Sequence, residues 1–227
     1  MFLFDNKAVM ESSKSSNTKF SLTRLNVFLS RCRRESGAID MKLYLEAFTE
    51  FNKFFPLLGA LFGFVVSDVK AKISILEHYL TKGDESSQYY DTVQSMIQYE
   101  VSNNITVVKG KPPSASRTLL RLHRALEFII QFLVSVTNVS DSDPLGPVAN
   151  KVYHDTLGQH HIWVIRKAVS FGVSRLPTRI QLLEQMDENG EAVDKTLQLL
   201  NQAVLDAQPI YDTVQELYAD NDLLHLP

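Results

Sequence analysis

The chain has 227 residues and a mass of 25.7 kDa, and a chain of this length buries about 70% of its unfolded surface, so it needs neither a disulfide nor a metal to fold. Its formal net charge of −3 argues against a generally cationic nucleic-acid-binding protein, so any basic site is local. The single cysteine, Cys32, excludes an intramolecular disulfide and indicates a reducing compartment. The sequence starts without the apolar core of a signal peptide, and its longest uncharged apolar run, residues 54–66, is too short to span a bilayer. A cytoplasmic protein is expected.

Helical spacing of apolar residues dominates the sequence after a polar, serine-rich start. Residues 1–18 are expected to form a flexible tail, and residues 19–227 a single domain. Apolar residues three and four apart predict helices, which glycine or proline ends or kinks. The first four predicted helices cover residues 20 to about 37, 43 to about 56, about 57–81, and 89–102.

The second half of the chain continues this pattern. A loop with glycine and proline precedes a helix that Ser114 or Ser116 can cap, and the segment 141–147 breaks the chain again. Residues 105–108 have the composition of a strand, but one strand makes no sheet, so the chain is predicted to be all-α. Further helices are predicted over residues 148–157, 161–174, 178–186 and 191–219, the last with a break near Pro209.

The segment RTLLRLHRALEFII, residues 117–130, carries an amphipathic stripe that changes character along its length. At about 100° per residue, Arg117, Arg121 and Arg124 lie within roughly 60° of each other, and phenylalanines continue the stripe. Cations at a helix N-terminus oppose the helix dipole, which favours an anion there. A phosphate at the first turn with hydrocarbon beyond it satisfies both halves of the stripe, as in a bound phospholipid. For Arg124, a structural pairing with an acid such as Glu127 is the favoured interpretation.

Two further constellations have both a structural and a functional interpretation. Asp68 and Lys72 are four residues apart, and such pairs are commonly solvated surface ion pairs. This pair, however, follows a long apolar segment, and a carboxylate there can accept hydrogen bonds from a polar ligand group. The adjacent His160 and His161 point about 100° apart on a helix and rarely chelate one metal ion.

The sequence was searched for the common catalytic and metal-binding motifs. The sequence lacks a GxSxG motif, a phosphate-binding loop, a dinucleotide-binding motif, and any HExxH or paired Cys/His set. Cys32 lies in an ordinary amphipathic helix without a nearby base. The chain is therefore expected not to be an enzyme and to need neither a metal nor a cofactor.

Four long segments, taken in order, resemble the glycolipid transfer protein superfamily, and within it the ceramide-1-phosphate transfer branch. The resemblance extends from about residue 42 to residue 227. It implies two layers of helices, about eight in number, with lipid chains held in a cavity between them and a headgroup site at the surface. The segments are FGFVVSDVKAKISILEHYL (62–80), SRTLLRLHRALEFIIQFL (116–133), HHIWVIRKAVSFGVSRLPTR (160–179) and LYADNDLLHLP (217–227).

The resemblance also implies roles for individual residues. Asp68 takes the place of the residue that holds the ceramide amide and hydroxyl, and His161 that of the histidine that contacts the amide carbonyl. Lys72 and Arg121 stand where glycolipid carriers have an asparagine and a tryptophan that bind the sugar. Arg117, one turn before Arg121, completes a phosphate cradle. Both replacements go from sugar binding to anion binding, so a phosphate headgroup is expected.

The predicted function is non-vesicular transfer of ceramide-1-phosphate between membranes by a monomer that contacts membrane surfaces transiently and binds no nucleic acid. Transfer or sensing of a glycosylated or phosphocholine-bearing sphingolipid is an alternative, as is a lipid-binding adaptor that signals through a protein partner. Lys109 or Lys111 is an additional candidate for the headgroup site. A membrane surface suits tryptophan together with cations, so the predicted docking residues are Trp163, Arg166, Lys167 and Arg175.

Overall fold

The computed structural model describes residues 19–107, 112–188, 190 and 192–227. The predicted tail, residues 1–18, and the candidates Lys109 and Lys111 lie outside the described residues. Within these ranges the chain forms nine α-helices and four 3₁₀ helices, with isolated bridges but no strand, so the prediction of an all-α fold is confirmed. The elements are α2 (Leu22–Cys32), α3 (Met41–Phe54), η1 (Phe55–Leu58), η2 (Ala60–Phe62), α4 (Gly63–Thr81), η3 (Ser87–Tyr90), α5 (Val93–Ser102), α6 (Ala115–Asn138), α7 (Leu145–Asp155), η4 (Leu157–His160), α8 (Trp163–Val173), α9 (Arg179–Met186) and α10 (Val193–Asp220).

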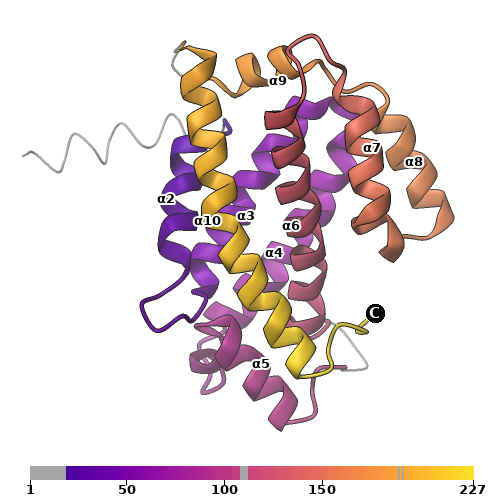
Figure 1. Ribbon diagram of the computed structural model, residues 1–227. Coiled ribbons are helices and arrows are strands. Elements are labelled where there is room, and N and C mark those ends of the chain that lie inside the picture. Colours follow the sequence, from indigo (N-terminus) through magenta and orange to yellow (C-terminus); the bar gives the residue numbers. More distant parts are fainter. Residues whose placement is uncertain (1–18, 108–111, 189, 191) are drawn as a thin grey trace, which may run out of the picture.

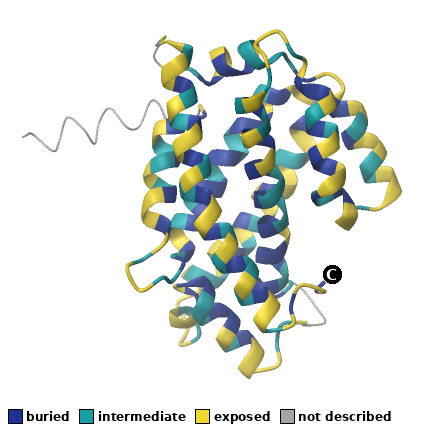
Figure 2. Cartoon of the chain, in the orientation of Figure 1, coloured by how far each residue is buried: buried dark blue, intermediate teal, exposed yellow. Residues whose placement is uncertain are grey.

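The long helices form two layers, as the resemblance implied. In Figure 1, α6 and α10 lie in front of α3 and α4. α2 packs against both α3 and α10, and α4 packs against α6, so the layers meet along both sides. α7 packs on α6 and carries α8 at the edge of the molecule. The helices turn their buried residues inward and their exposed residues outward (Figure 2), and the buried side chains form one continuous core.

The observed elements differ from the prediction in several places. α2 ends at Cys32, before Gly37, because the chain turns back there and Arg33 bridges to Ile39. The predicted helix over 57–81 begins as two 3₁₀ turns, because Gly59 has a φ of 118°, and α4 starts only at Gly63. The described part of the strand-like segment, residues 105–107, belongs to a turn region.

α10 runs unbroken through Pro209, so the predicted break is wrong. Proline has no N–H to bind the carbonyl of Leu205, four residues earlier, and it usually kinks a helix. Leu205 is 66% exposed, so the lost hydrogen bond falls on the outer side of the helix. On the inner side, Ala207, Ile210 and Val214 are buried in the core. Burial of that face keeps α10 continuous, and the helix packs against both α2 and α6.

A buried carboxylate from α5 holds the N-terminus of α6. Glu100 is 1% exposed, and its two oxygens accept the backbone N–H groups of Ala115 and Ser116 at 2.8 Å each. The Ser114 hydroxyl accepts the N–H of Arg117 at 3.2 Å, so Ser114 is the cap. The protein itself therefore supplies the anion that the helix dipole favours at this end. The dipole argument consequently gives no support for a ligand phosphate at the first turn.

Replacing Glu100 with glutamine is expected to lower the free energy of unfolding by about 2 kcal/mol. The glutamine amide accepts one of the two N–H groups but turns its own NH₂ toward the other. Glu216→Gln makes the same change at an exposed position of α10 and is the matched control, with an expected change below about 0.5 kcal/mol. Chemical denaturation measures both variants, and equal losses in the two would contradict the capping role of Glu100.

His123 is buried between α6 and α10. It is 1% exposed, its ring stacks on Tyr211 with 4.5 Å between centroids, and its Nε2 lies 2.8 Å from the Gln215 side-chain oxygen. Burial lowers the pKa of His123 to about 4 from its ordinary value of 6.5. Between these two pH values the unfolded chain binds a proton that the folded protein does not, so stability rises with pH in this window.

The free energy of unfolding is accordingly expected to fall as the pH is lowered from 6.5 to 4, by up to about 3 kcal/mol from His123 alone. Above pH 6.5 this contribution is constant. The measurement is denaturant unfolding at several pH values for the unchanged protein and for His123→Gln, which has no titrating ring. The variant should lose less stability on acidification, and parallel pH profiles would rule out the buried neutral histidine as the cause.

Candidate functional site

A cavity of about 480 Å³ lies between α4, α6 and α8, with contributions from α7 and the 3₁₀ turns. This volume is typical of a pocket for a small ligand. Much of its wall is hydrocarbon, which suits an apolar ligand. The apolar lining includes Phe62, Val69, Leu122, Phe128, Val169 and Val173.

Polar side chains from α4, α6, α7 and the turn before α8 also line this cavity. Lys72 Nζ lies 2.5 Å from a carboxylate oxygen of Asp68, so the ion pair expected from their spacing does form. The Lys72 side chain is 13% exposed, whereas that of Asp68 is 65% exposed and open to a ligand. Arg121 is exposed and has no hydrogen bond or ion pair with any residue that the structure describes. The polar lining residues are Asp68, Lys72, Arg121, Arg124, Tyr153, His160 and His161.

His161 is oriented by a tyrosine from α7. The Tyr153 hydroxyl lies 2.8 Å from His161 Nδ1. Burial lowers the pKa of His161, and the charge of Asp68 acts in the opposite direction, so the ring is neutral at pH 7. A Tyr153 hydroxyl that donates to Nδ1 leaves Nε2–H to donate to a carbonyl in the cavity. In this tautomer His161 has the N–H donor that binding an amide carbonyl requires.

The two other arginines of the stripe are bound by the chain that follows α10. Arg117 is not part of the cavity lining, and its Nε donates to the carbonyl of Pro227 at 2.8 Å. Arg124 does line the cavity, and its Nη2 donates to the carbonyls of Leu224 at 2.7 Å and Leu226 at 3.3 Å. The expectation that Arg124 has a structural role is consistent with these bonds, but its partners are carbonyls rather than an acid.

α8 exposes an aromatic and cationic face. Trp163 and Phe171 are 63% and 54% exposed. The ammonium of Lys167 lies 5.9 Å from the centre of the Trp163 ring, and the guanidinium of Arg175 lies 4.0 Å from that of Phe171. Trp163, Lys167 and Phe171 are spaced by four, so they lie on one side of the helix, and Arg175, just after its end, joins them through Phe171. Ile162, 71% exposed, joins this face to the cavity that it lines.

Arg166 differs from the other predicted docking residues because it is only half-exposed. It lies toward α7, where burial raises the pKa of Tyr153 and the Arg166 charge lowers it in part. The structure therefore brings Trp163, Lys167 and Arg175 together on one face and places Arg166 beside it.

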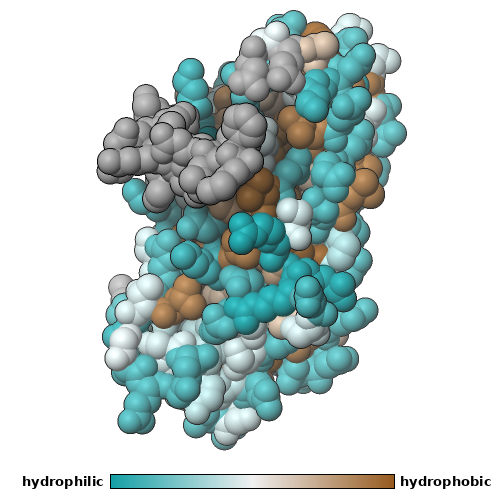
Figure 3. All heavy atoms as spheres, turned by 90° about the vertical axis from the view of Figure 1, so that its left-hand side faces the viewer, coloured by the Kyte–Doolittle hydropathy of each residue, from teal (hydrophilic) through white to brown (hydrophobic). Residues whose placement is uncertain are grey.

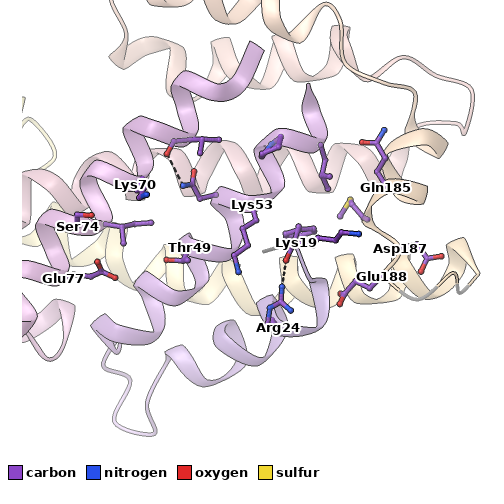
Figure 4. Close-up of a pocket in the computed structure, with 17 residues that line it drawn as sticks. Lys19, Arg24, Thr49, Lys53, Lys70, Ser74, Glu77, Gln185, Asp187 and Glu188 are labelled. Carbon is purple, nitrogen blue, oxygen red and sulfur yellow. Dashed lines mark hydrogen bonds between the residues drawn. The ribbon is translucent and has the colours of Figure 1, made fainter. Parts of the chain in front are cut away.

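A larger hollow of about 1230 Å³ lies between α3, α4 and the segment after α9 (Figure 4). None of the predicted site residues lines it. Its side chains carry both signs of charge, including Lys70 and Glu77, and Lys53 is paired with Glu50 at 2.9 Å. The face of the molecule that Figure 3 presents is mostly hydrophilic, with apolar residues interspersed. The mixed charges of the side chains that line the hollow single out no one ligand.

Nothing in the described ranges indicates catalysis or a metal. They contain no group of three or more His, Cys, Asp or Glu side chains able to hold a metal ion. Burial raises the pKa of the Cys32 thiol to about 12, which leaves it unreactive at neutral pH. Among the helices that the structure describes, none is both long and apolar enough to cross a membrane.

Comparison with known proteins agrees with this geometry. Residues 39–188, about two thirds of the chain, match the profile of the family described as glycolipid transfer protein. The chain belongs to the glycolipid transfer protein family. The ceramide-1-phosphate transfer protein of Mus musculus is 33% identical over 217 residues, which is 93% of this chain and 99% of the relative. That of Homo sapiens is 32% identical over 215 residues, again 93% and 99%.

Comparison with solved structures finds the same relatives. The crystal structure of the mouse ceramide-1-phosphate transfer protein in its apo form has a TM-score of 0.84 at 34% identity, and the match covers 92% of this chain and all of that one. The human protein in complex with 12:0 ceramide-1-phosphate has a TM-score of 0.83 at 31% identity, with the same coverage. The predicted fold and family are confirmed, and this member of the glycolipid transfer protein family is a lipid transfer protein rather than an enzyme.

Sequence reasoning missed three features of the site in this family member. Tyr153, which orients His161, is eight residues away in sequence and reads as an ordinary core tyrosine. Ile162 and Phe171 carry no charge, so they gave no signal for an exposed surface. The contacts of residues 223–227 with α6 are made by backbone carbonyls, which no side-chain pattern reveals.

Proposed function

We propose that this glycolipid transfer protein family member carries ceramide-1-phosphate between membranes. The observation that carries the proposal is Arg121, which lines an apolar cavity beside Lys72 and has no partner among the described residues. A guanidinium binds two phosphate oxygens at once, whereas a sugar offers it no charge. The relatives named as ceramide-1-phosphate transfer proteins, one of them solved with that lipid, support the same cargo.

Two sets of residues have separate roles in this proposal. Lys72, Arg117 and Arg121 bind the phosphate, whereas a neutral headgroup leaves the charge of Arg121 without a partner. Asp68 accepts the amide N–H and the hydroxyl of the ceramide, and His161 donates to its amide carbonyl. A glycerolipid ester has no N–H to donate, so this second set selects sphingolipids. Residues 19–227 act as one domain.

The apolar cavity accounts for the energetics of transfer. Exposing one methylene group to water costs about 0.8 kcal/mol, so a chain of about 14 methylenes costs on the order of 11 kcal/mol. The hydrocarbon walls around Leu122 and Phe128 remove much of that cost. No nucleotide is required, because the lipid moves down its concentration gradient.

Docking on the membrane is weak and reversible in this proposal, because a carrier must also leave. The face of α8 supplies it, with Trp163 and Phe171 inserted between headgroups and Lys167 and Arg175 attracted to anionic lipid. Ile162 connects that face to the cavity, so the lipid enters from the side that touches the bilayer. The protein works as a cytosolic monomer that visits membranes transiently.

Replacing Trp163 with alanine is expected to weaken binding to vesicles by roughly tenfold, since an indole buried in the interface contributes about 1.5 kcal/mol or more. Leu205→Ala removes an equally exposed apolar side chain from α10 and is the matched control. Vesicle flotation measures binding, and a soluble short-chain lipid tests the cavity independently. Equal vesicle binding by the two variants would exclude α8 as the docking face.

Intermembrane transfer of fluorescent lipids that differ only in headgroup tests the proposed cargo. Ceramide-1-phosphate should move faster than galactosylceramide and sphingomyelin carrying the same chains. Faster movement of the glycolipid would contradict the roles given to Lys72 and Arg121. Tight binding of the phosphate lipid without transfer would favour a lipid-sensing adaptor instead.

A further inference from the structure

The chain after α10 forms a strap, residues 223–227, over the start of α6. It reverses direction at Asp222, whose φ is 52°, and the N–H groups of Asp222 and Leu223 bind carbonyls of the last turn of α10. Leu223 and Leu226 are only 5% and 2% exposed. Two buried side chains therefore fasten the strap, and Figure 1 shows it returning toward α6 near the end marked C.

The strap makes its polar contacts through its backbone oxygens. Arg117 donates to Pro227 at 2.8 Å, and Arg124 donates to Leu224 and Leu226 at 2.7 and 3.3 Å. Pro227 itself lines the cavity, as does Arg121. One turn of helix thus separates an arginine that is held by the strap, Arg117, from one that is free, Arg121.

We infer that the strap is a specificity-determining segment, whose Pro227 backbone oxygen holds Arg117 until the phosphate of the cargo replaces it. This inference rests on the proposed function. The Pro227 oxygen binds Arg117 through Nε, whereas a phosphate is charged and takes both arms of the guanidinium fork, so phosphate forms the stronger interaction. A neutral headgroup offers the guanidinium no charge and leaves the strap in place.

The movement is confined to the end of the strap. Arg124 keeps its bonds to Leu224 and Leu226, and the buried Leu223 and Leu226 stay in the core. Release of Pro227 brings Arg117 to the headgroup and withdraws one residue from the cavity wall. The preference for a phosphate headgroup is therefore larger than Lys72 and Arg121 alone provide, because only an anionic headgroup also binds Arg117.

The test uses a spin label at the end of the strap, attached at Pro227→Cys, which keeps the backbone oxygen that Arg117 binds. Pro227 is exposed, and the one native cysteine, Cys32, is fully buried and escapes labelling. The protein is studied without lipid, with a short-chain ceramide-1-phosphate, and with the corresponding ceramide. Native mass spectrometry of the same samples measures how much lipid is bound. Asp220→Cys, exposed in the last turn of α10, is the control label outside the strap.

Ceramide-1-phosphate is expected to shift the spectrum of the label at position 227 toward the mobile component, and ceramide is expected to leave it unchanged. The label at position 220 should respond to neither lipid. Arg117→Leu should make the label at position 227 mobile without any lipid. Bound ceramide-1-phosphate with an unchanged or less mobile label would overturn the strap inference alone. Absence of bound ceramide-1-phosphate would overturn the proposed function and the strap inference with it.

Discussion

Replacing Arg121 with leucine is expected to lower ceramide-1-phosphate transfer by about 10- to 100-fold, because hydrogen bonds to a charged group contribute about 1.5–3 kcal/mol. Arg121 is the member of the cationic lining without a partner among the described residues, so its guanidinium is available to the ligand without any rearrangement. Its removal leaves the ion pair of Lys72 with Asp68 and the strap contacts intact. The fold should therefore be unaffected.

Two variants make this result interpretable. Arg121→Lys keeps the charge but loses the planar fork, so its transfer rate should lie between those of the unchanged protein and the leucine variant. Arg31→Leu makes the same change at an exposed position of α2, away from the cavity, and should transfer normally. Normal transfer by Arg121→Leu, with a circular dichroism spectrum that shows a folded protein, would contradict the proposal that Arg121 binds the phosphate.

Replacing Asp68 with valine is expected to lower the preference for ceramide-1-phosphate over phosphatidic acid by about 10- to 100-fold. The two lipids share a phosphate, but only the ceramide has an amide N–H and a hydroxyl for the carboxylate to accept. The same change releases Lys72 from its ion pair, so binding of phosphatidic acid should hold or improve. A ratio of the two affinities is therefore more informative than either affinity alone.

The chain offers a matched control for this variant. Lys151 and Asp155 form an ion pair with the same spacing of four on the exposed face of α7, at 2.8 Å. Asp155→Val removes that carboxylate without touching the cavity, and exposed pairs of this kind contribute about 0.5 kcal/mol or less. Competition binding with labelled lipid measures both ratios. If Asp68→Val and Asp155→Val kept the same ratio, Asp68 would have no role in amide recognition.

Much of the fold could be predicted from the spacing of apolar residues, and the predictions that were wrong have physical causes. The periodicity of apolar residues placed the helices because each needs one buried face, and the start of α6 at Ser114 follows from its side-chain chemistry. The break predicted at Pro209 was wrong because the free-energy cost of the proline is smaller than the gain from burying the inner face of α10. Glu100 was overlooked because its partners are backbone N–H groups that no residue type reveals.

The candidate site was predictable to the extent that it depends on side chains close in sequence. The stripe on α6 and the spacing of Asp68 and Lys72 gave its charges, and the structure brings Arg121 and Arg124 of the stripe to one cavity with that pair. The difference between Arg117 and Arg121 was beyond the sequence, because it arises from a carbonyl about a hundred residues away. Contacts between distant segments depend on helix packing, which local patterns do not determine.

Native mass spectrometry after incubation with mixed vesicles tests the central claim, the identity of the cargo, most directly. The vesicles contain equal amounts of ceramide-1-phosphate, phosphatidic acid, galactosylceramide and sphingomyelin with matched chains, and the protein is separated from them before measurement. The proposal predicts one bound lipid per protein, with ceramide-1-phosphate the dominant species. Predominance of galactosylceramide or sphingomyelin, or an equal share of phosphatidic acid, would contradict it.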